Sequence, residues 1–465
     1  MKYGTCDNNT MRYRWDQDSL GKVKIPYNAY YGAFTGRAVK QYRVTGRRAH
    51  AHLIRSFVMI KRSAAVANLK TGAIDGERAN SIIAACDAIL ADDKYYDQFV
   101  VDMINSGAGT AFNMNTNEVI ANVALHRILG KKRGRYTYLH PNDHVNMSQS
   151  SNDTYPTAMH MSILMNMDGV LPALRTLTES LRAKASEFSG FKKIGRTHLM
   201  DALPVTLGGE FAAHATSISN ATDALEATRG ALYAVALGGT AVGTGANTPK
   251  GYRRAAISEL ARVSGLPLKP EKDMQYGLQS RAAVAATSGA LRNLALEVGR
   301  LANDVRLMAS GPVAGLAEIG IPAVHAGSSI MPGKVNPSLA ECMNMICFGV
   351  MGNDAAVAYA AHAGQFELNV MLPGMLNAVL ESTDMLKNFV PIFATNLIDG
   401  LEANSENLRE HIEKSPVIVT LLAPKIGYLR AAELFKESLA TGKTIRELAV
   451  SKGVASGSEI DELLR

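Results

Sequence analysis

The densest group of side chains able to do chemistry lies at residues 327–337, which read GSSIMPGKVNP. Two glycines and two prolines in eleven residues indicate a shaped loop and not a helix. The loop carries the hydroxyl of Ser328, the amine of Lys334 and the amide of Asn336. A lysine beside an asparagine can hold a carboxylate, one by charge and one by a directional hydrogen bond, and a loop serine can act as a nucleophile or base. From composition alone, a polar turn with a surface lysine is the simpler interpretation.

Two other segments supply neutral hydrogen-bond donors. Residues 106–110 read SGAGT and end at Thr110, and Asn113, Asn115 and Asn117 follow. Residues 148–153 read SQSSND and precede a long helical pattern. Free N–H groups and the helix dipole make a helix N-terminus suited to an anion. An ordinary N-cap would explain one such residue, but not the run that includes Ser150, Ser151 and Asn152.

The strongest acid/base candidate is His198, which follows Thr197 in the segment GRTH. A single histidine is more often structural, but here it stands among otherwise neutral donors. Residues 238–245, GGTAVGTG, lack the preceding strand that a dinucleotide site requires, and we interpret them as a tight crossing between helices near a site. No phosphate-binding loop or metal-ligand spacing is found. The set suits a small dianion that undergoes proton transfer.

The elements that position these loops are expected to be helices, because Ala, Leu, Met and Glu are plentiful and long stretches of the chain lack proline. Residues 51–129 are expected to be helical with turns at 71–76 and 105–110, and long helices are expected at 157–188 and 207–237. Residues 1–50 are expected to be irregular. A heptad stripe runs from Leu291 to Met308 through Leu294, Val298, Leu301 and Val305, from which we expect helices of several subunits to share a core. The predicted domains are residues 1–146, 147–398 and 399–465.

Bulk composition excludes several classes of protein. The net charge of +7 comes from 49 basic and 42 acidic residues that are spread out, with short clusters such as Lys131, Lys132 and Arg133. Nucleic-acid binding is therefore not expected, and mild attraction of anionic substrates is. Four cysteines show no metal spacing, no apolar run is long enough for a membrane span, and the first residues lack a signal-peptide core. We expect a cytoplasmic protein without membrane contact.

Nearly the whole chain resembles the aspartase/fumarase superfamily. The resemblance rests on residues 327–337 together with the segments NMNTNEVIAN at 113–122, GRTHL at 195–199, GGTAVGTG at 238–245 and FELNV at 366–370. It implies a mainly all-α, three-domain fold whose central long helices form a twenty-helix core in a homotetramer. It also implies that each active site is shared between three subunits, takes a small dicarboxylate and needs neither cofactor nor metal.

The same resemblance assigns roles to individual residues. Ser328, on a closing loop, would remove a proton from the carbon beside one carboxylate, and His198 paired with Glu341 would handle the leaving water or amine. The residues expected to bind the carboxylates and the leaving group are Thr110, Ser150, Ser151, Asn152, Thr197, Lys334 and Asn336. Lys334 and loop N–H groups would help to make Ser328 basic.

The residues around the predicted site favour a fumarase-like member, which adds water to fumarate, over an aspartase-like member, which releases ammonia from aspartate. Residues 140–146, HPNDHVN, and Ser151 are typical of fumarases, in which the first of these loops forms a second dicarboxylate site; His140, Asn142 and Asp143 would be its residues here. Ala108 stands where fumarases typically carry a serine that touches substrate. It favours the aspartase-like alternative, as do residues 146–148, 325–327, 352–354 and 363–365. A catalytically silent member of the fold is a further alternative.

Overall fold

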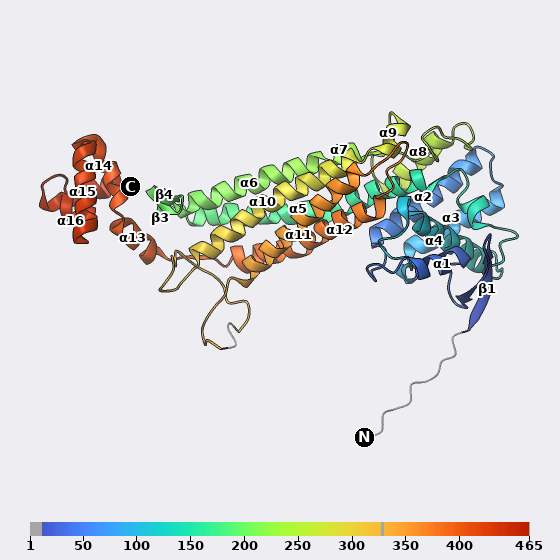
Figure 1. The fold of residues 1–465 in the computed structure, drawn as a ribbon, viewed down its shortest axis with the longest axis horizontal. Helices are drawn as coiled ribbons and strands as arrows, with labels where there is room; N and C mark the ends of the chain where they lie inside the picture. Colours follow the sequence, from blue (N-terminus) through green and yellow to red (C-terminus); the bar gives the residue numbers. More distant parts are fainter. Residues whose placement is uncertain (1–11, 327–329, 465) are drawn as a thin grey trace, which may run out of the picture. The chain divides into compact units, whose positions relative to one another are not determined.

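The computed structural model describes residues 12–326 and 330–464. The chain divides into two compact units, each assembled from three segments. Unit 1 comprises Met1–Gly169, Leu225–Arg292 and Val350–Asp384, and unit 2 comprises Val170–Ala224, Asn293–Gly349 and Met385–Arg465. Five long helices contribute residues to both units: α5 (Ser151–Glu187), α6 (Leu207–Ala227), α10 (Ala282–Met308), α11 (Ser338–His362) and α12 (Leu372–Phe393) (Figure 1). The predicted domain boundaries remain a prediction.

Unit 1 begins with an antiparallel hairpin of β1 (Tyr13–Asp18) and β2 (Gly21–Pro26), followed by α1 (Ala33–Gln41). The prediction that residues 1–50 are irregular is therefore wrong for this part. Val23 and Ile25 alternate with exposed lysines and pack with Ala29 and Ala33 in a small cluster, which explains why such short strands form.

The helical part of unit 1 is centred on α2 (Ala51–Lys70), which contacts both α3 (Gly76–Ala91) and α8 (Tyr252–Ser264). The turn predicted at 71–76 separates α2 from α3, as expected. The ring of Phe57 on α2 lies edge-on to Phe112 and Tyr155, with centroids 5.1 and 5.5 Å away. Other elements are η1 (Asp93–Gln98), η2 (Gly107–Gly109), α4 (Thr110–Val123), η3 (Ala124–Ile128), η4 (Pro141–Val145), α7 (Arg229–Leu232), β5 (Ala234–Val235), β6 (Lys269–Pro270) and α9 (Met274–Gln279).

Unit 2 contains the β3 (Lys192–Thr197) and β4 (Met200–Thr206) hairpin and a C-terminal group of short helices. Buried Ile412, Leu422, Leu434, Leu448 and Ile460 form the core of that group. The remaining elements of unit 2 are β7 (Ile319–Gly320), η5 (Ala394–Ile398), β8 (Glu402–Ala403), α13 (Ser405–Lys414), η6 (Pro416–Ile418), α14 (Val419–Ile426), α15 (Tyr428–Thr441), α16 (Ile445–Ser451) and α17 (Gly457–Leu463).

Helices dominate the described residues, so the prediction of a mainly α fold is confirmed. The heptad stripe of α10 is already buried within one chain, because its six residues are at most 5% exposed. The stripe is therefore no evidence for a second chain. The large apolar side chains left exposed on α11 include Met345, Phe348 and Tyr359, which are 63%, 62% and 77% exposed. Among the described residues, no helix combines the length and the apolar character that crossing a membrane requires.

Candidate active site

In unit 1 the structure brings Thr110, Ser150, Ser151 and Asn152 together at the first turn of α5. Ser150 accepts a hydrogen bond on its Oγ from the Asn152 backbone N–H at 3.2 Å, and Asp153 accepts one from the Ser150 N–H at 3.0 Å. These reciprocal bonds follow the logic of a capping box and explain why the helix begins here. The hydroxyls of Thr110 and Ser151 lie 3.0 Å apart, and both are partly exposed. This group of four residues is called the donor cluster below.

The carboxylate of Asp153 connects the donor cluster to the glycine-rich segment. Its Oδ2 accepts hydrogen bonds from the backbone N–H groups of Gly238 at 3.0 Å and Thr240 at 2.9 Å, and the side chain is fully buried. Asn152 adds a bond from its Nδ2 to the Ala241 carbonyl at 2.9 Å. Burial raises the pKa of Asp153 to about 7, against the hydrogen bonds from Thr240, Ser150 and Gly238, which lower it.

The glycine-rich segment itself differs from both sequence interpretations. It forms turns between β5 and α8, not a crossing between helices, and β5 does precede it. That strand is two residues long and pairs only with the equally short β6, so no dinucleotide-binding sheet is formed by the described residues. Gly238 adopts a φ of +84°, and a Cβ there would lie 2.8 Å from the Cβ of Arg253. The glycine is needed for the close approach.

Thr110 is positioned by the turn before α4. Ala108 and Gly109 have φ angles of +55° and +63°, and the Ala108 N–H bonds to the Val370 carbonyl at 2.9 Å. A Cβ on Gly109 would meet the ring of Tyr155 at 1.8 Å. Only glycine therefore allows the backbone to pass over Tyr155, which lies on α5 four residues after Ser151.

Behind the donor cluster lies a buried cation that the sequence analysis missed. Lys61, on α2 and fully buried, donates to Asn113 Oδ1 at 2.7 Å and Asn146 Oδ1 at 2.9 Å. Asn146 Oδ1 also accepts from Asn113 and Asn117, both at 3.1 Å. Burial lowers the pKa of Lys61 to about 7, opposed by the charge of Asp153. A usable signal was the helical spacing from Phe57 to Lys61, since a residue four positions from a core phenylalanine shares its face.

In unit 2 the turn of the β3–β4 hairpin carries the predicted acid/base residue. Thr197 pairs with Met200, and His198 and Leu199 fill the two turn positions with φ angles of +55° and +60°. These values match a type I′ turn, which suits the twist of a hairpin but favours Asn and Gly over His and Leu. Thr197 and His198 are both exposed.

A buried carboxylate anchors the base of that hairpin. Glu318 is fully buried and lies 2.7 Å from the Lys193 amine and 2.8 Å from the Arg196 guanidinium. Burial raises the pKa of Glu318, but the hydrogen bonds and charges of Lys193 and Arg196 outweigh this effect, and the pKa falls below its ordinary value. Arg196 directly precedes Thr197, so Glu318 fixes the strand that presents His198.

The hallmark loop is described only from residue 330 onward, so the predicted base Ser328 lies outside the described residues. Lys334 is exposed and lines a cavity of about 790 Å³ together with Asn336 and Arg306. Glu341 lies in the first turn of α11 and is exposed. Among the described residues of this one chain, no ion pair joins His198 to Glu341, so their pairing remains a prediction.

The predicted second dicarboxylate loop has a local structural use in unit 1. His140 caps η4, since its Nδ1 accepts from the backbone N–H groups of Asn142 and Asp143 at 3.2 and 3.3 Å. Its Nδ1 also lies 3.4 Å from the Asp143 carboxylate. Asn142 and Asp143 are exposed, and their binding of a ligand stays a prediction.

Comparison with known proteins gives a consistent result along the chain. A family profile described as "Lyase" matches residues 21–352, and one described as "Fumarase C C-terminus" matches residues 418–465. The aspartate ammonia-lyase of a Bacillus species is 43% identical over 451 residues, which cover 97% of this chain and 96% of that protein. The class II fumarate hydratase of Corynebacterium glutamicum is 44% identical over 452 residues, covering 97% and 94%.

A solved structure of similar sequence also shares the fold. The fumarate lyase:delta crystallin of Brucella melitensis, determined with bound cobalt, has a TM-score of 0.93 and is 43% identical. The matched regions cover 97% of this chain and 98% of that one.

Proposed function

Because this chain belongs to the aspartase/fumarase superfamily of lyases, we propose that it is a fumarate hydratase, which interconverts fumarate and L-malate. In the elimination direction, the deprotonated oxygen of Ser328, stabilised by Lys334 and loop N–H groups, takes a proton from the malate carbon next to one carboxylate and becomes a neutral hydroxyl. The electron pair left behind gives an enediolate, and the hydroxyl on the neighbouring carbon then leaves as water. The reverse sequence hydrates fumarate.

The role proposed for each site residue follows from where negative charge develops on the substrate during the reaction. The enediolate carries an extra negative charge, which Lys334 and Asn336 offset with a cation and an amide donor. The donor cluster, with Thr197, holds the carboxylates and the hydroxyl that departs. His198, with Glu341 from another subunit, delivers the proton to the departing hydroxyl. Closure of the loop that carries Ser328 excludes water from the reacting carbon.

One observation carries the proposal: the donor cluster consists of neutral side chains that hydrogen bonds bring together. The Thr110 and Ser151 hydroxyls contact each other at 3.0 Å, and capping bonds fix the Ser150 and Asn152 backbones. Neutral donors at a helix N-terminus bind a carboxylate through hydrogen bonds and the helix dipole. The assembly as a homotetramer with sites shared between three chains, in the cytoplasm and the tricarboxylic acid cycle, is part of the same proposal.

A second candidate is aspartate ammonia-lyase. Ala108 is buried at 4% exposure, and its methyl group stands two residues before Thr110, where a serine hydroxyl would add a contact to a hydroxylated substrate. Relatives of both activities match this chain at similar identity. A silent structural role is disfavoured because Ser328, His198, Lys334 and Asn336 are all present in the sequence.

The test follows the ultraviolet absorbance of fumarate in two parallel reactions, one with L-malate and one with L-aspartate, without added metal. A rise with malate alone supports the hydratase. A rise with aspartate alone replaces it by the ammonia-lyase. No rise in either reaction, from protein that is folded by circular dichroism, contradicts both activities.

A further inference from the structure

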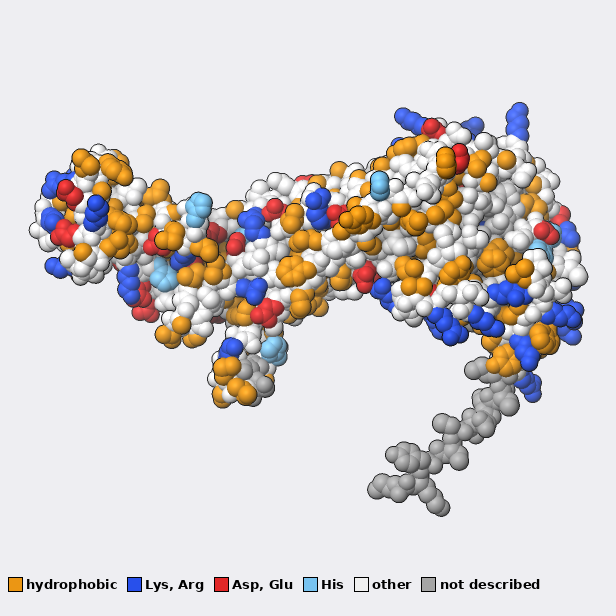
Figure 2. All heavy atoms as spheres, viewed as in Figure 1, with side chains coloured by type: hydrophobic (Ala, Val, Ile, Leu, Met, Phe, Trp, Pro, Cys, Tyr) orange, Lys and Arg blue, Asp and Glu red, His pale blue; other side chains and the backbone are white. Residues whose placement is uncertain are grey.

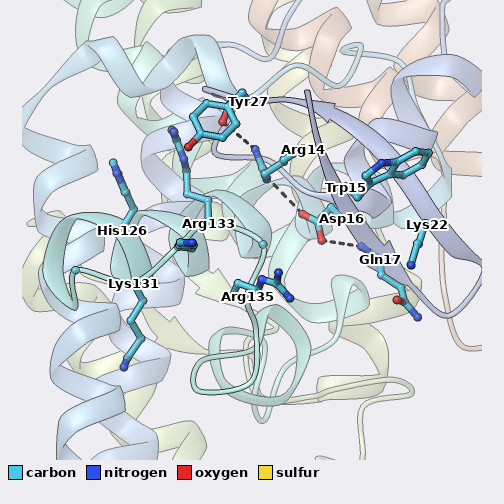
Figure 3. Close-up of a pocket in the computed structure, with 13 residues that line it drawn as sticks. Arg14, Trp15, Asp16, Gln17, Lys22, Tyr27, His126, Lys131, Arg133 and Arg135 are labelled. Carbon is cyan, nitrogen blue, oxygen red and sulfur yellow. Dashed lines mark hydrogen bonds and ion pairs between the residues drawn. The ribbon is translucent and has the colours of Figure 1, made fainter. Parts of the chain in front are cut away.

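A strongly basic cavity in unit 1 is lined by none of the predicted site residues. It has a volume of about 640 Å³ and is formed in unit 1 by β1, β2 and the loop after η3. Six lysine or arginine side chains line it against one carboxylate: the cations are Arg14, Lys22, Lys131, Lys132, Arg133 and Arg135, and the carboxylate is Asp16. Figure 3 shows several of these side chains around the cavity, and Figure 2 shows basic side chains gathered on this part of unit 1. We call it the basic pocket.

The single carboxylate of the basic pocket does not neutralise it. Asp16 is 3% exposed, forms an ion pair with Arg14 at 3.5 Å and accepts hydrogen bonds from the Tyr136 hydroxyl and the Gln17 N–H. Arg14 in turn is held by the carbonyls of Pro26, Ala29 and Tyr31. This pair is therefore structural.

The remaining cations face solvent without a carboxylate partner. Within residues 12–326 and 330–464, no ion pair is formed by Lys22, Lys132 or Arg135, and all three are exposed. Lys131 lies over the ring of Tyr138 at 4.9 Å, and because a ring carries no net negative charge, this contact does not neutralise the lysine. Like charges gathered on one surface repel each other, and a bound anion would remove that cost.

Residues 130–135 form the loop that carries most of these cations, and hydrogen bonds to neighbouring segments hold this loop in place. The Gly134 N–H donates to Asn122 Oδ1 at 2.7 Å, and the Lys131 N–H donates to the Leu125 carbonyl at 2.7 Å. The Arg133 guanidinium donates to the Asn28 carbonyl at 2.8 Å. The backbone of this loop is thus held in place, so binding need not order it, which reduces the entropy that binding must overcome.

We propose that the basic pocket binds a small polyphosphate anion, of the size and charge of a nucleoside triphosphate. Its volume lies within the range of about 300–1,000 Å³ that is usual for small-molecule sites. A dicarboxylate would neutralise two charges, whereas a triphosphate carries about twice as many and matches arginine and lysine donors. Trp15 and Tyr27 line the same pocket and are 62% and 52% exposed. Lys24 lies over the Trp15 ring at 5.5 Å and Arg133 over the Tyr27 ring at 5.7 Å, so a base would stack on the ring faces that these cations do not cover.

The experiment measures the affinity of the full-length protein for tripolyphosphate and for ATP by calorimetry at low salt, without divalent metal. The variant K132A/R135A removes two cations of the pocket, and K40A/K70A removes the same charge from exposed positions of unit 1 outside it. We expect the first variant to bind tripolyphosphate at least tenfold more weakly and the second to stay within twofold of the wild type. Circular dichroism and the melting temperature verify that both variants fold.

Several results would overturn the proposal. Equal loss of affinity in both variants would mean that net charge and not the pocket attracts the anion. Displacement of tripolyphosphate by excess fumarate would place the anion in the candidate active site. Tighter binding of a single-stranded oligonucleotide than of ATP would indicate a nucleic-acid surface. ATP that binds no better than tripolyphosphate would contradict the stacking by Trp15 and Tyr27.

Discussion

Asp153 accepts a hydrogen bond from the backbone of Gly238 at 3.0 Å, and this contact joins two segments that are 85 residues apart in the sequence. The same carboxylate bonds to the Ser150 N–H, so one buried group holds both the donor cluster and the glycine turn beside it. Asp153 is fully buried and is not itself among the residues predicted to bind substrate. It acts on the reaction through the residues that it positions.

Asp153→Asn should therefore reduce both stability and activity. The asparagine amide has the size of the carboxylate, but one of its two ends is an NH2 group, which cannot accept a hydrogen bond. That end would face either the N–H groups of Gly238 and Thr240 or the N–H group of Ser150, and the lost bonds should lower the free energy of unfolding by about 1–3 kcal/mol. We expect kcat/KM to fall by about a hundredfold, as for a misplacement of about 1 Å. Urea unfolding and steady-state kinetics measure the two effects.

The matched control is Asp168→Asn, which makes the same chemical change at a side chain that is 57% exposed and paired with Arg229. Exposed ion pairs contribute about 0–1 kcal/mol, so this variant should be close to the wild type. Equal effects of the two substitutions would remove the positioning role of Asp153.

Lys61→Met should reveal the buried amine through the pH dependence of stability. The pKa of Lys61 is lowered to about 7, below the ordinary value of 10.5, so between these values the unfolded chain binds more protons than the folded one. Stability contributed by Lys61 therefore rises as pH increases from about 7 to about 10.5. The wild type should gain stability relative to Lys61→Met as pH rises through this window.

Chemical denaturation at pH 7 and pH 9.5 measures the change. Lys70→Met, on the same helix but exposed, is the control and should show no such difference between the two pH values. A constant gap between the wild type and Lys61→Met would contradict the lowered pKa.

Glu318→Gln should loosen the hairpin that presents Thr197 and His198. Removing one partner of a buried ion pair costs about 3–5 kcal/mol, because Lys193 and Arg196 lose their counter-charge. The pKa of Glu318 is held low in the folded state, so its contribution is present above the ordinary value of 4.5 and is lost as pH falls below it. The destabilisation should be full at pH 7 and shrink toward pH 3.

Thermal unfolding across this range measures the effect, with Glu297→Gln as the control. Glu297 pairs with Arg300 on the surface of unit 2, where a loss of about 0.5 kcal/mol or less is expected. A pH-independent effect of Glu318→Gln would mean that packing and not charge is lost.

Gly109→Ala should be far more damaging than Gly46→Ala, although both glycines have positive φ angles, of +63° and +71°. A Cβ at residue 46 has nothing within 4 Å, so it adds only backbone strain of about 1–2 kcal/mol. A Cβ at residue 109 would overlap the ring of Tyr155 at 1.8 Å. Unfolding curves and activity are measured for both variants, because Gly46→Ala reports backbone strain alone and Gly109→Ala reports strain together with overlap. Equal losses of stability and activity in the two variants would contradict the need for close packing on Tyr155.

Ser328→Ala should remove nearly all turnover while substrate affinity stays largely intact, because the proposed base acts on the reacting carbon and not on the carboxylates. Lys334→Ala is the contrasting variant and should weaken dicarboxylate binding severely, since a bound carboxylate would lose its cation. Steady-state kinetics and equilibrium binding separate the two outcomes. Normal turnover in Ser328→Ala would show that another group is the base.

The sequence predicted features that depend on neighbouring residues and failed where distant contacts decide. The long helices, the turn at 71–76 and the donors at the start of α5 follow from local pattern, and the structure contains them. The hairpin of β1 and β2 was missed because its strands are short and only Val23 and Ile25 carry the apolar signal. The glycine turns were misinterpreted because Asp153, which holds them, lies far away in the sequence.

The burial of Lys61 was equally hidden, because a lysine in a helix is usually exposed and its asparagine partners lie on other elements. The cavity of cations around residues 130–135 could be anticipated only in part. The sequence displays the cluster at Lys131, Lys132 and Arg133, but not that β1 and β2 complete a pocket around it.

The turn of the β3–β4 hairpin has a consequence for protein engineering. His198 and Leu199 occupy two positions where Asn-Gly would relieve backbone strain, so a library screened for heat resistance alone should enrich for replacement of the imidazole. The proposed chemistry requires that same imidazole. Selection for durability and selection for turnover should therefore choose different residues at position 198 and could agree at position 199, where glycine would relax the turn and leave the histidine in place.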